Sequence, residues 1–99
     1  MKVLIDDLNK AFESRIRLGL MSILMVEDKA DFNMLKETLN ITDGNLASHI
    51  TALEKAGYVK VNKQFVGKKP NTTYEATAEG KRAFNKHLDT LEKILKQRE

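Results

Sequence analysis

Apolar residues recur at helical spacing in the first quarter of the chain. In residues 3–12 they form one stripe, so we expect a short first helix that ends near Glu13. In residues 16–26 they are too dense for a one-sided surface helix, and Ser14 stands where an N-cap is needed. The pattern therefore predicts a short amphipathic helix followed by a central helix that is buried on several sides.

A short third helix and a fourth helix with both ends marked are predicted next. Asn33 is the expected cap of the third helix, which ends at Leu39 and follows a very short strand at residues 30–32. The fourth helix begins after Thr42, a favourable N-cap, and ends at Gly57, where a left-handed C-terminal cap fits. A turn of about three residues separates the two helices, which is the spacing of a helix-turn-helix.

The fourth helix has an apolar stripe and an unusual outer face. A solvated helix normally carries long charged side chains, but on this outer face only Lys55 has that character. Short polar side chains beside Ala and Gly allow the close approach that a helix needs in the DNA major groove. An ordinary surface helix is the alternative interpretation. The candidate recognition residues are Asp43, Gly44, Asn45, Ser48, His49, Thr51, Ala52 and Lys55.

A β-hairpin is predicted directly after this helix. Residues 58–65 are rich in β-formers and alternate apolar and polar side chains from Val59 to about Lys63, residues 66–71 contain Gly, Pro and Asn, and residues 72–76 again favour a strand. A solvated turn with two lysines is the alternative, but a hairpin behind a helix-turn-helix is the wing of a winged helix. The candidate wing residues are Lys63, Lys68, Lys69, Asn71 and Thr72.

A long last helix, capped by Thr77, carries more apolar positions than a small domain can cover. We expect Gly80 to pack closely against a neighbour and Phe84 to lie inside the domain. Residues 1–13 and 78–99 should then form a dimer region around a two-fold axis. The candidate interface residues are Leu4, Leu8, Phe12, Leu88, Leu91, Ile94 and Leu95.

Composition narrows the function classes. The chain has 99 residues, so we expect one domain, residues 1–99. It has no Cys, which excludes disulfides, thiolate metal sites and a Cys nucleophile. No Ser/His/Asp grouping, carboxylate pair or phosphate loop has a supporting context, so we expect no enzyme and no cofactor. No signal segment or membrane-spanning run is present, which predicts a cytoplasmic protein without a membrane partner.

The distribution of charge along the chain is more informative than the net charge. The formal net charge is +3, and residues 41–74 alone contain five Lys against two Asp or Glu. This excess coincides with the fourth helix and the hairpin. A local basic surface is expected where a protein meets a phosphate backbone.

Several segments at characteristic spacing resemble a known family. They are residues 31–36, 39–50, 53–59 and 73–80, and they include Asp43-Gly44-Asn45-Leu46, Leu53-Glu54-Lys55-Ala56-Gly57-Tyr58-Val59 and Thr77-Ala78-Glu79-Gly80. The chain resembles the small winged-helix transcription regulators related to the MarR and ArsR groups over most of residues 16–84. The resemblance implies a DNA-binding dimer in which residues 43–52 read the major groove. Residues 68–71 would lie along the adjacent backbone or minor groove.

Two departures from the family qualify this resemblance. ArsR-type metal sensors use Cys or clustered His and carboxylates, whereas His49 and His87 lie far apart in the sequence, so no metal site is expected. Larger MarR-type proteins have longer terminal helices that form a ligand pocket, whereas this chain has only a short first helix and one long last helix. A small-molecule effector is therefore possible by resemblance, but nothing in this sequence supports one.

The predicted fold is mainly α with a small β-hairpin, a winged helix-turn-helix with a long C-terminal dimerisation helix. The predicted function is that of a sequence-specific regulator of transcription, a repressor, which binds double-stranded DNA at a pseudo-palindromic operator as a homodimer. The alternative is a winged-helix protein–protein interaction module in a larger assembly. Lys68 and Lys69 on the wing favour DNA, whereas an apolar outer face on the fourth helix would have favoured a protein.

Overall fold

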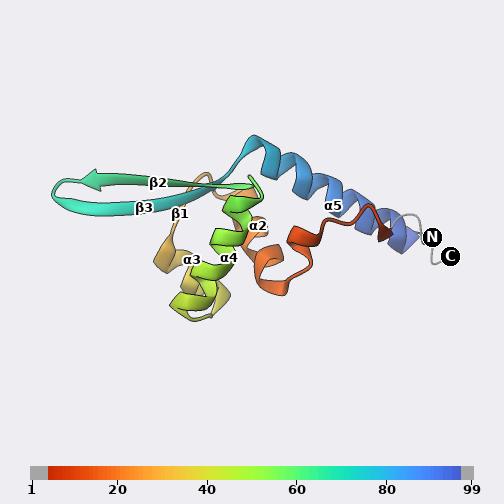
Figure 1. Ribbon diagram of the computed structural model, residues 1–99, viewed down its shortest axis with the longest axis horizontal. Helices are drawn as coiled ribbons and strands as arrows, with labels where there is room; N and C mark the ends of the chain where they lie inside the picture. The colour runs from red at the N-terminus through yellow and green to blue at the C-terminus, as the bar shows by residue number, and fades with distance from the viewer. Residues whose placement is uncertain (1–4, 97–99) are drawn as a thin grey trace.

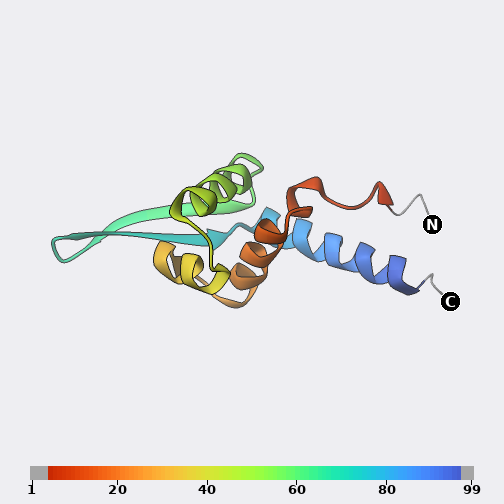
Figure 2. The ribbon, with the colours of Figure 1, turned by 90° about the horizontal axis from the view of Figure 1, so that it is seen from below.

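Three helices and a small sheet surround one core in the computed structural model, which describes residues 5–96 (Figures 1 and 2). The helices are α2 (Arg15–Val26), α3 (Phe32–Leu39) and α4 (Asp43–Lys55). A β-ribbon extends from one end of this body and α5 from the other, so the molecule is elongated (Figure 1). The remaining elements are η1 (Lys10–Phe12), β1 (Ala30–Asp31), β2 (Val59–Val66), β3 (Lys69–Ala76) and α5 (Ala78–Lys96).

Helix α2 is the centre of the core, as its dense apolar pattern predicts. Leu20, Met21 and Leu24 are almost completely buried, and they pack with Leu46 and Leu53 of α4. Burying an aliphatic side chain of this size stabilises the fold by roughly 1.5–3 kcal/mol. The face of α4 opposite to this contact is therefore directed outward.

The sheet is antiparallel, with strand order β1-β3-β2, and contains a longer ribbon than expected. Pairing of β2 with β3 runs from Val59 and Ala76 to Val66 and Lys69. Only a two-residue turn remains, with Gly67 at a φ of 66°, a conformation that glycine adopts without steric cost. The predicted loop at residues 66–71 is therefore wrong, because its second half belongs to β3.

Pro70 lies within β3, although proline has no N–H and is not normally found in a central strand. Strand β1 pairs with β3 only through Ala30 with Tyr74 and Asp31 with Thr73. Beyond that point β3 has an open edge, so the missing N–H of proline leaves no ladder bond unmade there.

The N-terminal segment differs from the helix expected over residues 3–12. Within residues 5–12, Ile5 is helical, residues 6–7 form a turn, and Lys10–Phe12 form the separate 3-10 turn η1; Leu4 lies outside the described residues. The backbone N–H of Asn9 donates to His87 Nδ1 (3.0 Å), and the Asn9 side chain accepts from the Ala11 N–H (2.9 Å). A helix continuing through Asn9 would need that N–H for a carbonyl four residues earlier, so the contact with α5 replaces helical pairing.

Most of the expected helix ends are confirmed. Ser14, Thr42 and Thr77 each accept a hydrogen bond from a first-turn N–H of the helix that follows. Gly57 has a φ of 83° and ends α4 with the left-handed cap. Helix α3 is the exception, because Asp31 rather than Asn33 is its cap, accepting from the Met34 N–H at 2.8 Å.

Candidate nucleic-acid interface

The outer face of α4 is exposed and has few long side chains. Leu46, Ile50 and Leu53 point into the core. On the opposite side, every candidate recognition residue except His49 is exposed. Thr51 donates its hydroxyl hydrogen to the Ala47 carbonyl (2.9 Å), which leaves its oxygen free to accept. The helix therefore presents short donors and acceptors to the outside.

Asp43, at the start of α4, is paired across the helix-turn-helix. Its carboxylate lies 2.8 Å from Lys36 Nζ on α3, and the side chains of Lys36 and Asp43 are 41% and 72% exposed. An exposed pair of this kind contributes little to stability. It does reduce the negative charge that Asp43 would otherwise present beside an approaching phosphate.

His49 is half-buried and is held by α2. Arg17 donates from Nη1 to His49 Nδ1 (3.1 Å) and from Nε to the Ala11 carbonyl (2.6 Å). Because a guanidinium has donors only, His49 Nδ1 must accept, and the ring proton lies on Nε2. Burial, and then the neighbouring Arg17 charge, lower the pKa of His49, which keeps the ring neutral. The sequence around Arg17 and His49 held no sign of this contact, because 32 positions separate the two residues.

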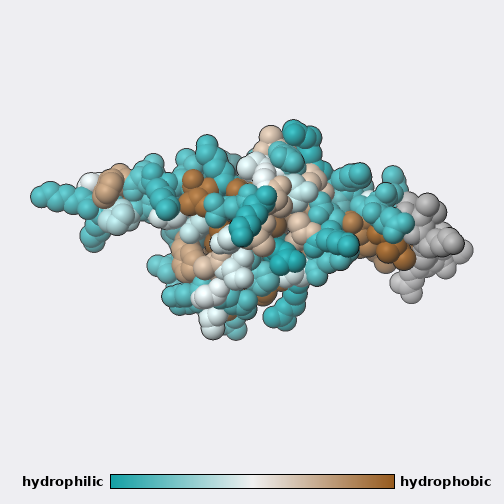
Figure 3. All heavy atoms as spheres, in the orientation of Figure 1, coloured by the Kyte–Doolittle hydropathy of each residue, from teal (hydrophilic) through white to brown (hydrophobic). Residues whose placement is uncertain are grey.

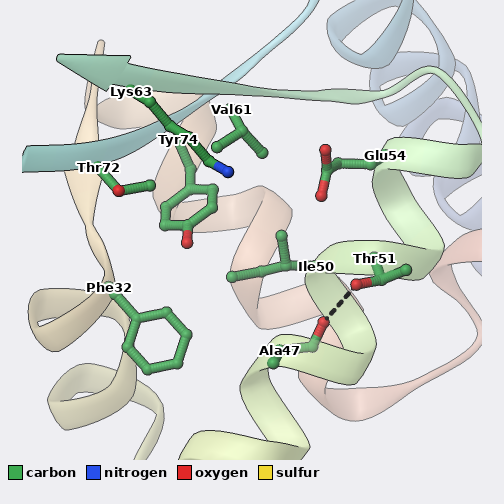
Figure 4. Close-up of a pocket in the computed structure, with 9 residues that line it drawn as sticks. All are labelled: Phe32, Ala47, Ile50, Thr51, Glu54, Val61, Lys63, Thr72 and Tyr74. Carbon is green, nitrogen blue, oxygen red and sulfur yellow. Dashed lines mark hydrogen bonds between the residues drawn. The ribbon is translucent and has the colours of Figure 1, made fainter.

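A cleft of about 310 Å³ separates α4 from the ribbon (Figure 4). Val61 and Tyr74 on the ribbon point toward Ile50 on α4, and the Glu54 carboxylate lies at one side of the space (Figure 4). Burial, and then the nearby Glu54 charge, raise the pKa of Tyr74, so its hydroxyl stays protonated. Lys63 and Thr72 stand at the outer end of the same cleft and connect it to the wing.

The wing residues form a cationic extension of the body. Lys63, Lys68 and Lys69 are exposed, while Asn71 and Thr72 are half-buried. Within residues 5–96, no carboxylate lies within ion-pairing distance of these lysines. Their charges are therefore available to an anionic partner.

The terminal region places the candidate dimer residues in two environments. Phe12 is 2% exposed, stacks on Tyr58 (ring centroids 5.3 Å apart) and meets Phe84 edge-on (5.1 Å), so its assignment to an interface is wrong. Leu88 and Leu95 are 41% and 60% exposed. The half-buried members of the set are Leu8, Leu91 and Ile94.

His87 and Thr90 are buried polar residues of α5 that the apolar pattern did not identify. His87 accepts the Asn9 N–H, and the Asn9 side chain donates to the Tyr58 hydroxyl (2.9 Å). Burial lowers the pKa of His87, while the Glu13 charge acts weakly in the opposite direction. These bonds fasten the N-terminal segment to α5 and to Tyr58, which precedes β2.

Two classes of site are not found in the described part of the chain. Residues 5–96 contain no cluster of three His, Asp or Glu side chains that could hold a metal ion. No helix among them is long and apolar enough to cross a membrane.

The helix-turn-helix of α3 and α4, followed by the cationic ribbon, defines a winged-helix protein of the DNA-binding class. A family model described as a winged helix DNA-binding domain matches residues 16–95. The chain belongs to this family. A transcriptional regulator homologue from Pyrococcus horikoshii OT3 is 31% identical, with a TM-score of 0.85 over 97% of this chain and 93% of that chain.

Two further comparisons place the chain among related proteins. An uncharacterised protein of Methanocaldococcus jannaschii is 35% identical over 79 residues, which are 80% of this chain and 86% of that protein. A MarR-family regulator from Enterococcus faecalis V583 shares the fold, with 21% identity and a TM-score of 0.73 over 98% of this chain and 86% of that chain. The chain is thus a winged-helix, DNA-binding regulator with the fold of the MarR group.

Proposed function

We propose that this protein is a transcriptional repressor that binds a pseudo-palindromic operator as a homodimer. The observation that carries the proposal is the arrangement of two surfaces on one side of the body. The exposed face of α4 carries short polar side chains, and the adjacent ribbon carries lysines without acidic partners. A helix of this character fits the major groove, while the lysines fit the flanking phosphates.

The recognition set divides by chemistry. Asn45 and Ser48 are exposed side chains with both donor and acceptor groups, so they suit direct reading of base edges. His49 offers only an Nε2–H donor, because Arg17 occupies Nδ1. The wing lysines suit phosphate contacts, which position the protein on the backbone without reading the bases.

Dimerisation is argued from the apolar face of α5. Leu88 and Leu95 remain exposed on a helix whose other side is charged, and Ile5 (54% exposed) adds to the apolar surface of the terminal segments. Each large aliphatic side chain left in water forgoes roughly 1.5–3 kcal/mol relative to full burial. A second copy, related by a two-fold axis, covers this face and places two α4 helices about 34 Å apart, or a multiple of that distance.

Selection of bound sites from random duplex DNA tests the function. The expected result is an enriched pseudo-palindrome whose half-site spacing matches one or more helical turns. Enrichment of no sequence, together with equal affinity for random and selected duplexes, would refute sequence-specific regulation. Capture of a protein by the α4 face without duplex binding would favour the interaction-module alternative.

Sedimentation of α5 variants tests the dimer. Leu88→Lys and Leu95→Lys should each yield monomers that bind the selected operator much more weakly, because charge is placed on the apolar face. Asp89→Lys is the matched control, since it adds positive charge to an exposed position of the same helix. A monomeric unmodified protein at micromolar concentration, on and off DNA, would contradict this part of the proposal.

A further inference from the structure

Five of the six exposed large apolar side chains in the described chain lie in two places, and one of these is the wing tip; the sixth, Val26, is the last residue of α2. Ile5, Leu88 and Leu95 belong to the terminal region. Phe65 and Val66 are 74% and 62% exposed and are adjacent on the ribbon, next to the turn. A light-brown spot near the free end of the ribbon is surrounded by hydrophilic residues in Figure 3.

The two apolar side chains lie on opposite faces of the ribbon, because successive residues of a strand alternate. Val61, Lys63 and Phe65 share one face, and Val61 and Lys63 line the cleft against α4 (Figure 4). Phe65 therefore continues the face that looks toward the recognition helix, about 7 Å beyond Lys63 along the strand. Its cross-strand partner is Pro70, so this face ends in a small apolar pair.

The charges around Phe65 and Pro70 indicate which kind of partner this apolar pair contacts. Residues 60–74 contain four lysines and no acidic residue, and Lys63 and Lys68 lie on either side of Phe65 along the ribbon. An apolar protein surface would leave these charges poorly solvated. A second copy is a poor partner for this tip because its own net charge is +3. The phosphates along the edges of a DNA groove fit the lysines, and the floor of the groove fits the apolar side chain.

Groove width determines which part of the wing can enter. The minor groove is about 6 Å wide and excludes a β-ribbon, but it admits a flat aromatic ring. Apolar side chains that enter the minor groove wedge between base steps and bend the duplex by roughly 20–90°. Resting on the DNA-binding function proposed above, we infer that Phe65, backed by Pro70, is an apolar wedge that enters the minor groove and bends the operator.

The variants that test the wedge differ at one ribbon position each. Phe65→Ala removes the ring, Phe65→Leu keeps an apolar wedge, and Val66→Ala is the control on the other face. Because both side chains are exposed, these changes should leave the melting temperature unchanged, which a thermal melt checks. Lys68→Ala is the control for loss of a phosphate contact.

Affinity and bending are measured on one probe, a duplex of about 30 base pairs selected by the unmodified protein and labelled at its ends for energy transfer. Phe65→Ala should bind about tenfold more weakly and lose most of the bend, since contacts between an aromatic ring and bases are worth about that much. Its salt slope should stay unchanged because no charge is lost, whereas Lys68→Ala should lower the slope by roughly 1. Val66→Ala should stay within about twofold of the unmodified protein, and Phe65→Leu should retain most of the bend.

Three results would overturn the wedge while leaving the proposed function intact. They are an unbent duplex with the unmodified protein, unchanged binding and bending in Phe65→Ala, and equal losses in Phe65→Ala and Val66→Ala. Failure of the unmodified protein to select any duplex would instead overturn the DNA-binding proposal, and the wedge with it.

Discussion

Replacement of Gly80 by Ala should destabilise this fold strongly, although Ala is the better helix former. Gly80 lies in the first turn of α5, where its N–H bonds to the Thr77 side chain. A Cβ added there would lie 2.2 Å from the Tyr58 carbonyl oxygen and 2.9 Å from its carbonyl carbon and Cα. The atoms in the way are backbone, so no side-chain rotation can relieve the overlap.

The magnitude follows from what must move. The Tyr58 carbonyl accepts the Thr77 N–H (2.9 Å), so it is held at the junction of sheet and helix. Relief requires a shift of α5, which carries the buried Phe84 and His87. Overpacking costs about 1–3 kcal/mol, and more when backbone must move, against a gain of roughly 0.5–1 kcal/mol from Ala in a helix. We expect a net loss of about 2 kcal/mol, which lowers Tm by roughly 8–16 °C.

Thermal and urea unfolding at one protein concentration measure this loss. Gly44→Ala is the matched control, because a Cβ at Gly44 meets nothing within 4 Å and its backbone is helical. That variant should be unchanged or more stable by up to about 1 kcal/mol. Gly80→Ala melting at or above the unmodified protein would show that α5 and the sheet are not held in this close contact.

Three further outcomes test the site. Asn45→Ala should change base preference at one position of each half-site by roughly 1–3 kcal/mol in competition binding, and an equal loss on random DNA would argue against direct readout. In imidazole NMR, His49 should carry its proton on Nε2, and Arg17→Met should raise its pKa; an Nδ1–H ring would contradict the Arg17 bond. The pKa of His87 is lower in the folded protein than in the unfolded chain, so as the pH falls below about 6.5 His87 is protonated in the unfolded chain while it is still neutral in the folded one. The free energy of unfolding should therefore decrease from that pH down to the folded-state pKa. His87→Gln should weaken this pH dependence of the free energy of unfolding, and an unaltered slope would exclude His87 as a source.

Local features of the sequence determined most of the fold. Ser14, Thr42, Gly57 and Thr77 are helix-end residues whose preference depends on hydrogen bonds and dihedral angles within one turn, so the chain near each of them was sufficient. The apolar periods likewise identified α2 as central and the outer face of α4. The predicted fold of helix-turn-helix, ribbon and long last helix is confirmed for this reason.

Contacts between distant residues were decided only by the tertiary structure. Asn9 gives its N–H to His87, 78 positions away, whereas the continuous helix predicted over residues 3–12 would need that N–H for a carbonyl four residues earlier. The packing of the N-terminal segment against α5 also buries the side chains of Phe12 and His87. Arg17 donates a hydrogen bond to His49, 32 positions away, and thereby fixes the ring proton of this recognition residue on Nε2. Periodicity describes which side of an element is apolar, but only packing decides which neighbour each side meets.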